Sequence, residues 1–188
     1  PTSSNKLSGM VLSNRDNTGK QPVLLVIHGW TSQMARYPER VENIVDMGYV
    51  AVLFDMRGHG ETGGELDLLS LHDHLDDCVV AYDYAMSLDS VNTDNISVFG
   101  SSYGGYLASL LTAERRVDHL VLNVPADYPD DIIDKPALQR SKLTDIYRMK
   151  PHSPDDGKAF SAISNYKGDL LLIEAEKDEQ VHPQVLFY

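Results

Sequence analysis

Five short apolar runs set the strongest limit on how this chain can fold. Each is continuously apolar rather than alternating, which is typical of strands that helices cover on both faces. The runs occupy residues 23–27, 49–54, 96–99, 120–124 and 170–173. Helical patterns separate the first three runs and follow the third. This alternation predicts a doubly wound, mostly parallel α/β sheet.

Local signals support the helices between these runs. Pro38 suits the first position of one helix and Gly48 suits its end. Ser70 and Asp73 resemble a capping box ahead of a clear apolar stripe. A weaker strand is expected within residues 7–12, before a turn-like polar segment.

Residues 126–167 interrupt the alternation, because about 40 residues separate two strands where one helix would need fewer. Prolines divide this insertion, and short helices are expected at 137–147 and 155–165. An insertion at this point would stand at the C-terminal ends of the strands, where such sheets bind ligands. Tyr128 and Ile132 either line a pocket there or hold the insertion onto the body of the protein.

The third helix of this order would begin at a G-x-S-x-G motif, residues 100–104, directly after an apolar run. A sharp turn between strand and helix lifts the central side chain, Ser102, out of the fold. It would lie at a helix N-terminus, where partial positive charge favours a nearby oxyanion. The motif therefore indicates a nucleophilic serine; the alternative is a plain Gly/Ser turn.

His28, Gly29 and Trp30 follow the first strong strand. A loop at this place can supply one backbone N–H to an oxyanion hole, and a glycine lets it approach closely. The amide of Tyr103 would be the other donor. The alternative is a glycine turn beside a buried tryptophan.

A carboxylate that orients a histidine is expected after the last strand. Asp178 is well placed for this role, with Glu174, Glu176 and Glu179 as competitors.

Asp55 begins a glycine-rich loop, residues 55–60, after another strand. We expect it to order that loop through local hydrogen bonds rather than to act in catalysis.

Composition excludes several classes of protein. The 188 residues fit one domain, with 42% hydrophobic residues and a net charge of −12, which argues against nucleic acid and anionic membranes as partners. No apolar run is long enough to span a membrane. The single cysteine, Cys78, allows neither an internal disulfide nor a cysteine-based zinc site. No metal or cofactor is expected. A cytoplasmic location is expected, although the chain does not begin with Met and an upstream signal peptide stays an alternative.

Together the motifs at residues 28–30, 55–60, 100–104 and 176–178 resemble the α/β-hydrolase superfamily in their order and spacing. The resemblance covers nearly the whole chain from about Val23. Its sequence after the serine is similar to carboxylesterases, dienelactone-hydrolase-like enzymes and prolyl-oligopeptidase-like domains.

The resemblance implies Ser102 as nucleophile, Asp178 as acid and the amides of Trp30 and Tyr103 as the oxyanion hole. It also implies that residues 126–167 form a small cap over the site. We expect substrate contacts from four residues near these motifs: His28, Gly29, Tyr128 and Ile132.

The departure from the family pattern is the catalytic histidine. Average element lengths place it roughly 25–30 residues past Asp178, whereas the sequence ends at Tyr188. The last strand, the last helix and the base are thus expected to be absent from this sequence, or the base comes from elsewhere. His182 is the nearest substitute. A chain ending at Tyr188 should be poorly stable or pair with a second copy, as a homodimer, through an exposed strand edge.

Two hypotheses of function follow. The first is a serine hydrolase that cleaves a small-molecule ester, or a thioester or amide, through an acyl-enzyme on Ser102. The second is a non-catalytic ligand-binding or interaction protein of the same fold.

Overall fold

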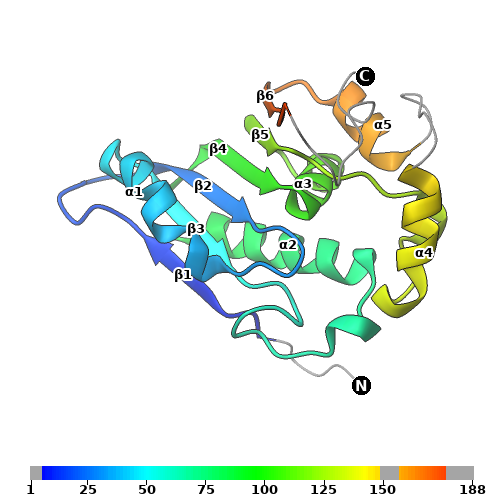
Figure 1. Ribbon diagram of the computed structural model, residues 1–188. Coiled ribbons are helices and arrows are strands. Elements are labelled where there is room, and N and C mark those ends of the chain that lie inside the picture. The colour runs from blue at the N-terminus through cyan, green and yellow to red at the C-terminus, as the bar shows by residue number, and fades with distance from the viewer. Residues whose placement is uncertain (1–5, 149–156, 177–188) are drawn as a thin grey trace.

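The computed structural model describes residues 6–148 and 157–176, and the structural statements below concern these residues. They form a six-stranded sheet with helices on both faces (Figure 1). The strands are β1 (Gly9–Leu12), β2 (Gln21–Ile27), β3 (Val50–Phe54), β4 (Val91–Ser101), β5 (His119–Asn123) and β6 (Asp169–Ile173). The helices are α1 (Pro38–Asp46), α2 (Leu71–Ser87), α3 (Tyr103–Glu114), α4 (Ala137–Arg148) and α5 (Lys158–Asn165).

The strand order in the sheet is β1-β3-β2-β4-β5-β6. β1 runs antiparallel to β3, and the other neighbouring strands are parallel. This confirms the doubly wound, mostly parallel α/β sheet, and the weaker strand expected within residues 7–12 is β1. Gly100, near the end of β4, pairs with Ile27 on one side and Leu122 on the other. Residues that follow β2, β4 and β5 therefore meet at one edge of the sheet.

β4 is longer than the expected strand at residues 96–99. Gln21 pairs with Val91, but Val23 pairs with Ile96, so the register between β2 and β4 shifts. Such an irregularity lets a strand absorb extra residues. The extra residues, 92–95, are polar, so the apolar pattern could not include them.

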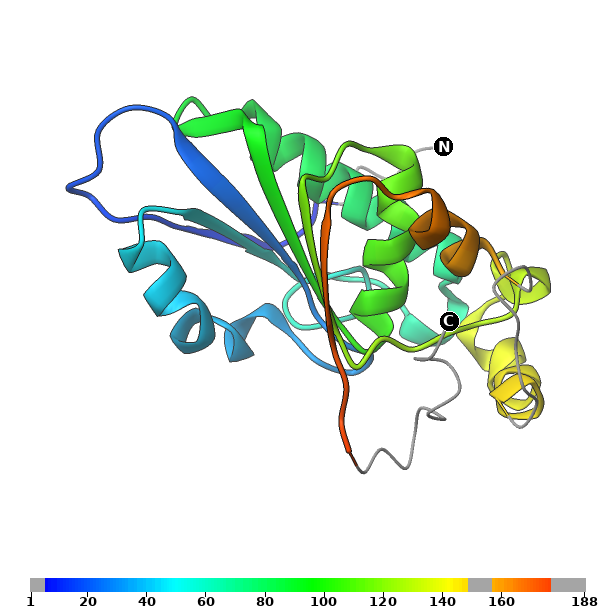
Figure 2. The same ribbon diagram turned by 90° about the horizontal axis from the view of Figure 1, so that it is seen from above.

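The two faces of the sheet bury separate cores. Val23, Leu25 and Ile27 pack in the larger core with residues of α2 and α3. Leu24 and Val26 point to the opposite face and pack with residues of α1. Figure 2 shows α1 on one side of the sheet and α2, α3 and α5 on the other. This alternation explains why the strands read as unbroken apolar runs.

The helix signals in the sequence are confirmed. Pro38 is the first residue of α1, and Gly48 follows that helix with a φ of 99°. At α2, the Ser70 hydroxyl accepts from the Asp73 N–H, and the Asp73 carboxylate accepts from the Ser70 N–H. Both bonds of the capping box are present.

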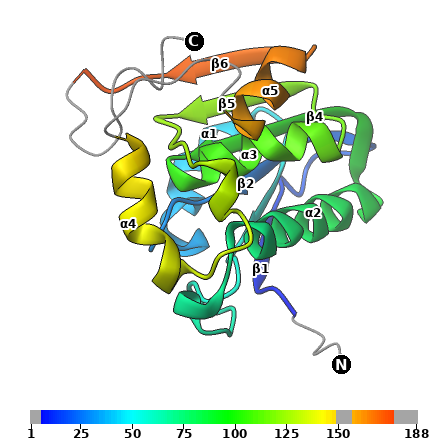
Figure 3. The same cartoon turned by 90° about the vertical axis from the view of Figure 1, so that its right-hand side faces the viewer.

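Residues 126–167, which were expected to form one cap, divide into two parts. α4 lies at the side of the molecule to which the arrowheads of β2 and β4 point (Figures 1 and 3). α5 instead packs against α3, and its Ala159 belongs to the larger core. α5 is therefore the helix that connects β5 to β6 on one face of the sheet, and α4 alone has the position of a cap.

β6 forms the edge of the sheet opposite β1, as Figure 3 shows. Its apolar side chains are 37–55% exposed: Leu170, Leu171, Leu172 and Ile173. Pairing of this edge with a second copy stays a prediction.

Candidate active site

Ser102 occupies a strained turn between β4 and α3. Its φ of 52° and ψ of −114° lie in a region that residues with a side chain rarely adopt. The Ser102 N–H donates to the Asn123 carbonyl (2.9 Å), and its own carbonyl accepts from the N–H groups of Gly105 and Ala126. The turn is thus held by α3 and by the chain that follows β5. This is the backbone geometry expected of a nucleophile elbow.

Close packing explains the glycines on both sides of the serine. A Cβ on Gly104 would overlap the Ile27 carbonyl oxygen, and a Cβ on Gly100 would overlap the Gly104 carbonyl oxygen. A Cβ on Gly105 would lie 2.8 Å from the Cβ of Pro125. The G-x-S-x-G spacing therefore follows from helix α3 lying directly on β2 and β4.

The loop after β2 lies against this elbow. A Cβ built on Gly29 would be 3.7 Å from the Ser102 Cβ and 3.3 Å from the Ser101 carbonyl oxygen. Trp30 follows, and its ring packs edge-on against the Tyr103 ring with centroids 5.2 Å apart. The structure thus brings together Ser102, Gly29, Trp30 and Tyr103, as the sequence predicted.

A chain of hydrogen bonds fixes Tyr103. Its hydroxyl and the Nδ1 of His74 are 2.7 Å apart, and His74 Nε2 lies 3.0 Å from the Arg57 carbonyl oxygen. A carbonyl can only accept, so His74 Nε2 carries the proton and Nδ1 accepts from the Tyr103 hydroxyl. Burial lowers the pKa of His74 to about 3, which keeps it neutral in this role.

His28 has a structural environment. It is 1% exposed, and its Nδ1 lies 2.9 Å from the Gly29 carbonyl oxygen while its Nε2 accepts from the Met56 N–H at 3.2 Å. Burial lowers the pKa of His28 to about 4. Because backbone groups engage both ring nitrogens, His28 fastens the loop after β2 to the loop after β3. The surroundings give no support to the expected substrate contact.

Asp55 orders its loop, as expected. Its two carboxylate oxygens accept from the N–H groups of Met34 (2.6 Å) and Glu61 (3.0 Å), and its backbone carbonyl accepts from the Thr62 hydroxyl. A Cβ on Gly60 would overlap this carboxylate, which explains the glycine at a φ of 49°.

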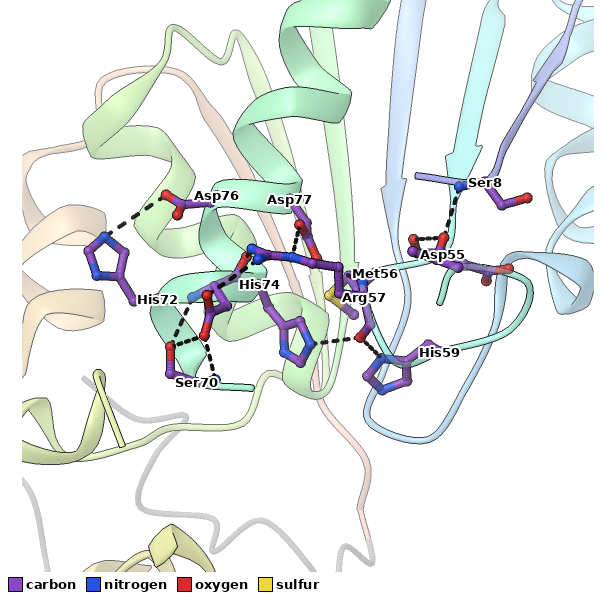
Figure 4. A network of polar contacts seen from close by, with 12 residues as sticks. Ser8, Asp55, Met56, Arg57, His59, Ser70, His72, His74, Asp76 and Asp77 are labelled. Carbon is purple, nitrogen blue, oxygen red and sulfur yellow. Dashed lines mark hydrogen bonds and ion pairs between the residues drawn. The ribbon is translucent and has the colours of Figure 1, made fainter. Parts of the chain in front are cut away.

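Arg57 joins the same loop to helix α2 (Figure 4). Its Nε donates to one oxygen of Asp77 at 2.6 Å, and its backbone N–H donates to the other at 2.8 Å. One guanidinium nitrogen lies 3.3 Å from the Asp73 carboxylate. The carbonyl of Arg57 accepts from the rings of His59 and His74. This network was not predicted from the sequence, although Arg57 lies in the glycine-rich loop at residues 55–60.

The two cap residues singled out from the sequence differ. The Tyr128 ring contacts the rings of Tyr103 and Tyr106, with centroids 5.7 and 4.9 Å away, so Tyr128 lies near the elbow. Ile132 is fully buried in the larger core. Of the two alternatives, the surroundings of Ile132 favour holding the insertion onto the body.

Asp178, Glu179 and His182 lie outside the described residues, so the expected acid and the substitute base are not placed here. Glu174 and Glu176 follow β6 and are exposed.

In the described part of the chain, the hydrogen bonds of the histidines go to partners other than Ser102. His28, His59 and His74 are buried against backbone carbonyls. His72 and His119 pair with Asp134 and Asp169 at the surface.

Neither a metal site nor a membrane span is present in the described residues. No group of three His, Cys, Asp or Glu side chains there could hold a metal ion. No helix there is long and apolar enough to cross a membrane. Cys78 is a buried free thiol, and burial raises its pKa well above the usual value.

Comparison with known proteins decides the family. The profile of the family described as serine aminopeptidase, S33 (Hydrolase_4), matches residues 19–186. The chain belongs to this hydrolase family. The resemblance to the α/β-hydrolase superfamily is thereby confirmed, and solved esterase structures share the fold.

Curated relatives match over part of their length. The quorum-quenching protein AidA of Acinetobacter baumannii (strain MDR-ZJ06) is 31% identical over 86 residues, 45% of this chain and 28% of that protein. An uncharacterized 31.7 kDa protein of Escherichia coli, from the traX-finO intergenic region, is 27% identical over 62% of this chain and 42% of its own. The chain thus spans less than half the length of these relatives.

Two solved structures show the similarity of fold. Est1E from Butyrivibrio proteoclasticus, with ferulic acid bound, superposes with a TM-score of 0.70 at 20% identity, over 96% of this chain and 79% of that chain. An acetyl xylan esterase from Paenibacillus sp. R4 gives a TM-score of 0.62 at 19% identity, over 94% and 75%.

Proposed function

We propose that this protein is a serine hydrolase that cleaves a carboxylic ester of a small molecule, with Ser102 as the nucleophile. The observation that carries the proposal is the strained backbone of Ser102 between β4 and α3, with the loop of Gly29 packed against it. Strain of this kind persists only where the surrounding structure holds it, and it gathers at catalytic sites.

The proposed reaction has two halves. Ser102 Oγ attacks the ester carbonyl and gives its proton to a histidine base, while the amides of Trp30 and Tyr103 stabilise the oxyanion. The histidine returns the proton to the leaving alcohol, and an acyl-enzyme remains. Water then attacks the acyl carbonyl by the same route and restores Ser102. No cofactor takes part.

The partners of Ser102 rest on the family pattern. Asp178 is proposed to orient the histidine, with His182 as the substitute base within this sequence. The names of Est1E and the acetyl xylan esterase support an ester as substrate in preference to an amide, and they carry the substrate class only as part of this proposal.

Labelling with a fluorophosphonate probe tests the nucleophile. The full-length protein should react once, at Ser102, and the Ser102→Ala variant should not react. The exposed Ser87→Ala variant is a matched control that should label like the wild type. A screen of p-nitrophenyl esters of increasing chain length then defines the acyl group. Absence of labelling and of hydrolysis would contradict the proposal and favour a non-catalytic ligand-binding protein of the same fold.

A further inference from the structure

A buried arginine of the cap contacts both aromatic residues beside the nucleophile. Arg140 of α4 is 4% exposed. Its guanidinium carbon lies 4.8 Å from the centre of the Trp30 ring and 5.8 Å from that of the Tyr103 ring. A cation–π contact binds the guanidinium through its charge, and the face of the ring supplies no hydrogen-bond acceptor for the N–H groups.

Arg140 has no anionic partner within the described residues. The ion pairs there involve other arginines, namely Arg57, Arg115 and Arg116. The Nη1 of Arg140 is buried and makes no hydrogen bond there. Burying an unpaired charge is costly, because nothing replaces the water that it loses. An unsatisfied buried group of this kind calls for an explanation, and a ligand that supplies the missing acceptors is one.

The position of Arg140 ties such a ligand to the proposed reaction. Tyr103 directly follows Ser102, and Trp30 directly follows Gly29, which lies against the Ser102 Cβ. An anion held by Arg140 would therefore belong to the same molecule as an ester held at Ser102.

The local charge indicates the kind of anion. Arg57, a partly buried arginine whose carbonyl accepts from His59 and His74, is already paired with Asp77 and Asp73. Of these two arginines, Arg140 alone lacks a carboxylate partner within the described residues, and a single guanidinium charge matches a monoanion. A guanidinium edge and a carboxylate also share a planar, two-pronged geometry.

We infer that Arg140 binds a carboxylate carried by the substrate, so that the ester cleaved at Ser102 also bears a free carboxylate group. This inference rests on the proposed function for the ester bond, but the binding of the carboxylate can be measured without catalysis.

The kinetic test compares two chain-matched substrates, the monoanion p-nitrophenyl hydrogen adipate and the neutral p-nitrophenyl hexanoate. The full-length wild type should prefer the adipate in kcat/KM. Arg140→Gln should lower the ratio of the two kcat/KM values by about 10- to 100-fold, the range expected for hydrogen bonds to a charged group. Arg140→Lys should give a ratio between that of the wild type and that of Arg140→Gln. The matched control Arg115→Gln, a half-exposed arginine paired with Asp83, should leave the ratio unchanged.

The binding test uses a protein without the nucleophile. In the Ser102→Ala background, monomethyl adipate should raise the Tm and methyl hexanoate should not, and the added Arg140→Gln change should remove the effect. An unchanged adipate-to-hexanoate ratio in Arg140→Gln would overturn the inference, as would stabilisation by methyl phosphate in place of monomethyl adipate. If neither ester is hydrolysed but monomethyl adipate binds through Arg140, the proposed reaction fails and the carboxylate site stands.

Discussion

Two arginines, the partly buried Arg57 and the buried Arg140, are held in opposite ways. Arg57 is surrounded by acceptors: the carboxylates of Asp77 and Asp73 and the Asp73 carbonyl take hydrogen bonds from its guanidinium. Arg140 contacts the rings of Trp30 and Tyr103, and its Nη1 has no acceptor within the described residues. The hydrogen bonds of Arg57 are made within the fold and secure a loop to a helix. Those of Arg140 are incomplete within the described residues, which suits a site that binds a ligand.

The same contrast extends to the residues around each arginine. Near Arg57, the polar atoms of the α2 capping box, of His74 and of the Asp55 carboxylate find partners within the fold. Near Arg140, the backbone of Ser102 is strained. Strain and unmet hydrogen bonds are destabilising, so they mark the part of the molecule where function opposes stability.

Loss of the proposed nucleophile should give the largest effect and should separate the two regions most sharply. Ser102→Ala is expected to lower kcat for ester hydrolysis by at least about 10³-fold, as loss of a triad serine does. The free energy of unfolding should stay close to that of the wild type, because the side chain of Ser102 holds no other element in place within the described residues. Turnover of p-nitrophenyl esters and urea denaturation of the same preparation measure both quantities. Near-normal turnover would move the nucleophile elsewhere.

Removing one charged side chain in each region compares the surroundings of the two arginines. Asp77→Ala leaves the Arg57 charge without its closest partner and should cost about 3–5 kcal/mol of unfolding free energy.

Arg140→Met should change the unfolding free energy by no more than about 1 kcal/mol, because the lost cation–π contacts are offset by removal of an unpaired buried charge. Equal losses in the two variants, measured by urea denaturation, would show that both arginines are equally well paired.

Acid should weaken the Arg57 region. The folded pKa values of His28 (about 4) and His74 (about 3) lie below the usual 6.5, and burial also lowers that of His59. Below pH 6.5 the unfolded chain therefore binds more protons, and stability falls as the pH falls. Asp77 offsets the proton uptake of one histidine, because burial raises its pKa to about 6 and the folded state therefore binds a proton there first.

The net loss between pH 6 and 4 should be about 1.4–2.7 kcal/mol per pH unit, one to two protons. Urea denaturation at pH 6, 5 and 4 measures this slope. The control His72→Gln, at an exposed histidine, should keep the wild-type slope. A stability that does not change over this range would show that the buried histidines are already protonated in the folded protein.

Removal of the helix cap should give the smallest effect. Ser70→Ala deletes the hydroxyl that accepts from the Asp73 N–H and should cost about 1 kcal/mol. Ser87→Ala, near the exposed end of the same helix, should cost less than half as much. A cap loss that also impaired hydrolysis would show that α2 positions the site as well as stabilising it.

Local sequence signals carried most of the fold. The strands, the capping box and the glycines around Ser102 follow from neighbours in sequence, through burial on both faces, helix ends and close packing. The length of β4 was missed because a register shift lets polar residues 92–95 join a strand. α5 was assigned to the cap because spacing alone could not show that it packs on α3.

The site was predicted where a motif is local and missed where contacts cross the fold. Ser102, Gly29, Trp30 and Tyr103 come together as expected. The role of Arg140 could not be predicted from the sequence. Its contact with Trp30 joins residues far apart in the chain, and nothing in the local sequence distinguishes it from an arginine exposed to solvent. The hydrogen bond of His28 to Met56 had no signal for the same reason, because it depends on how two loops meet.

The hydrogen bond from Ser102 to Asn123 has a consequence for the order of folding. The Ser102 conformation needs β5 in place to accept this bond, and it needs Gly104 seated against Ile27 of β2. An isolated β4–α3 unit cannot hold it. During refolding, reactivity toward a fluorophosphonate should thus return only after β2, β4 and β5 have assembled, later than the helical circular-dichroism signal. The reactivity of Ser102 would then report when the central sheet is complete.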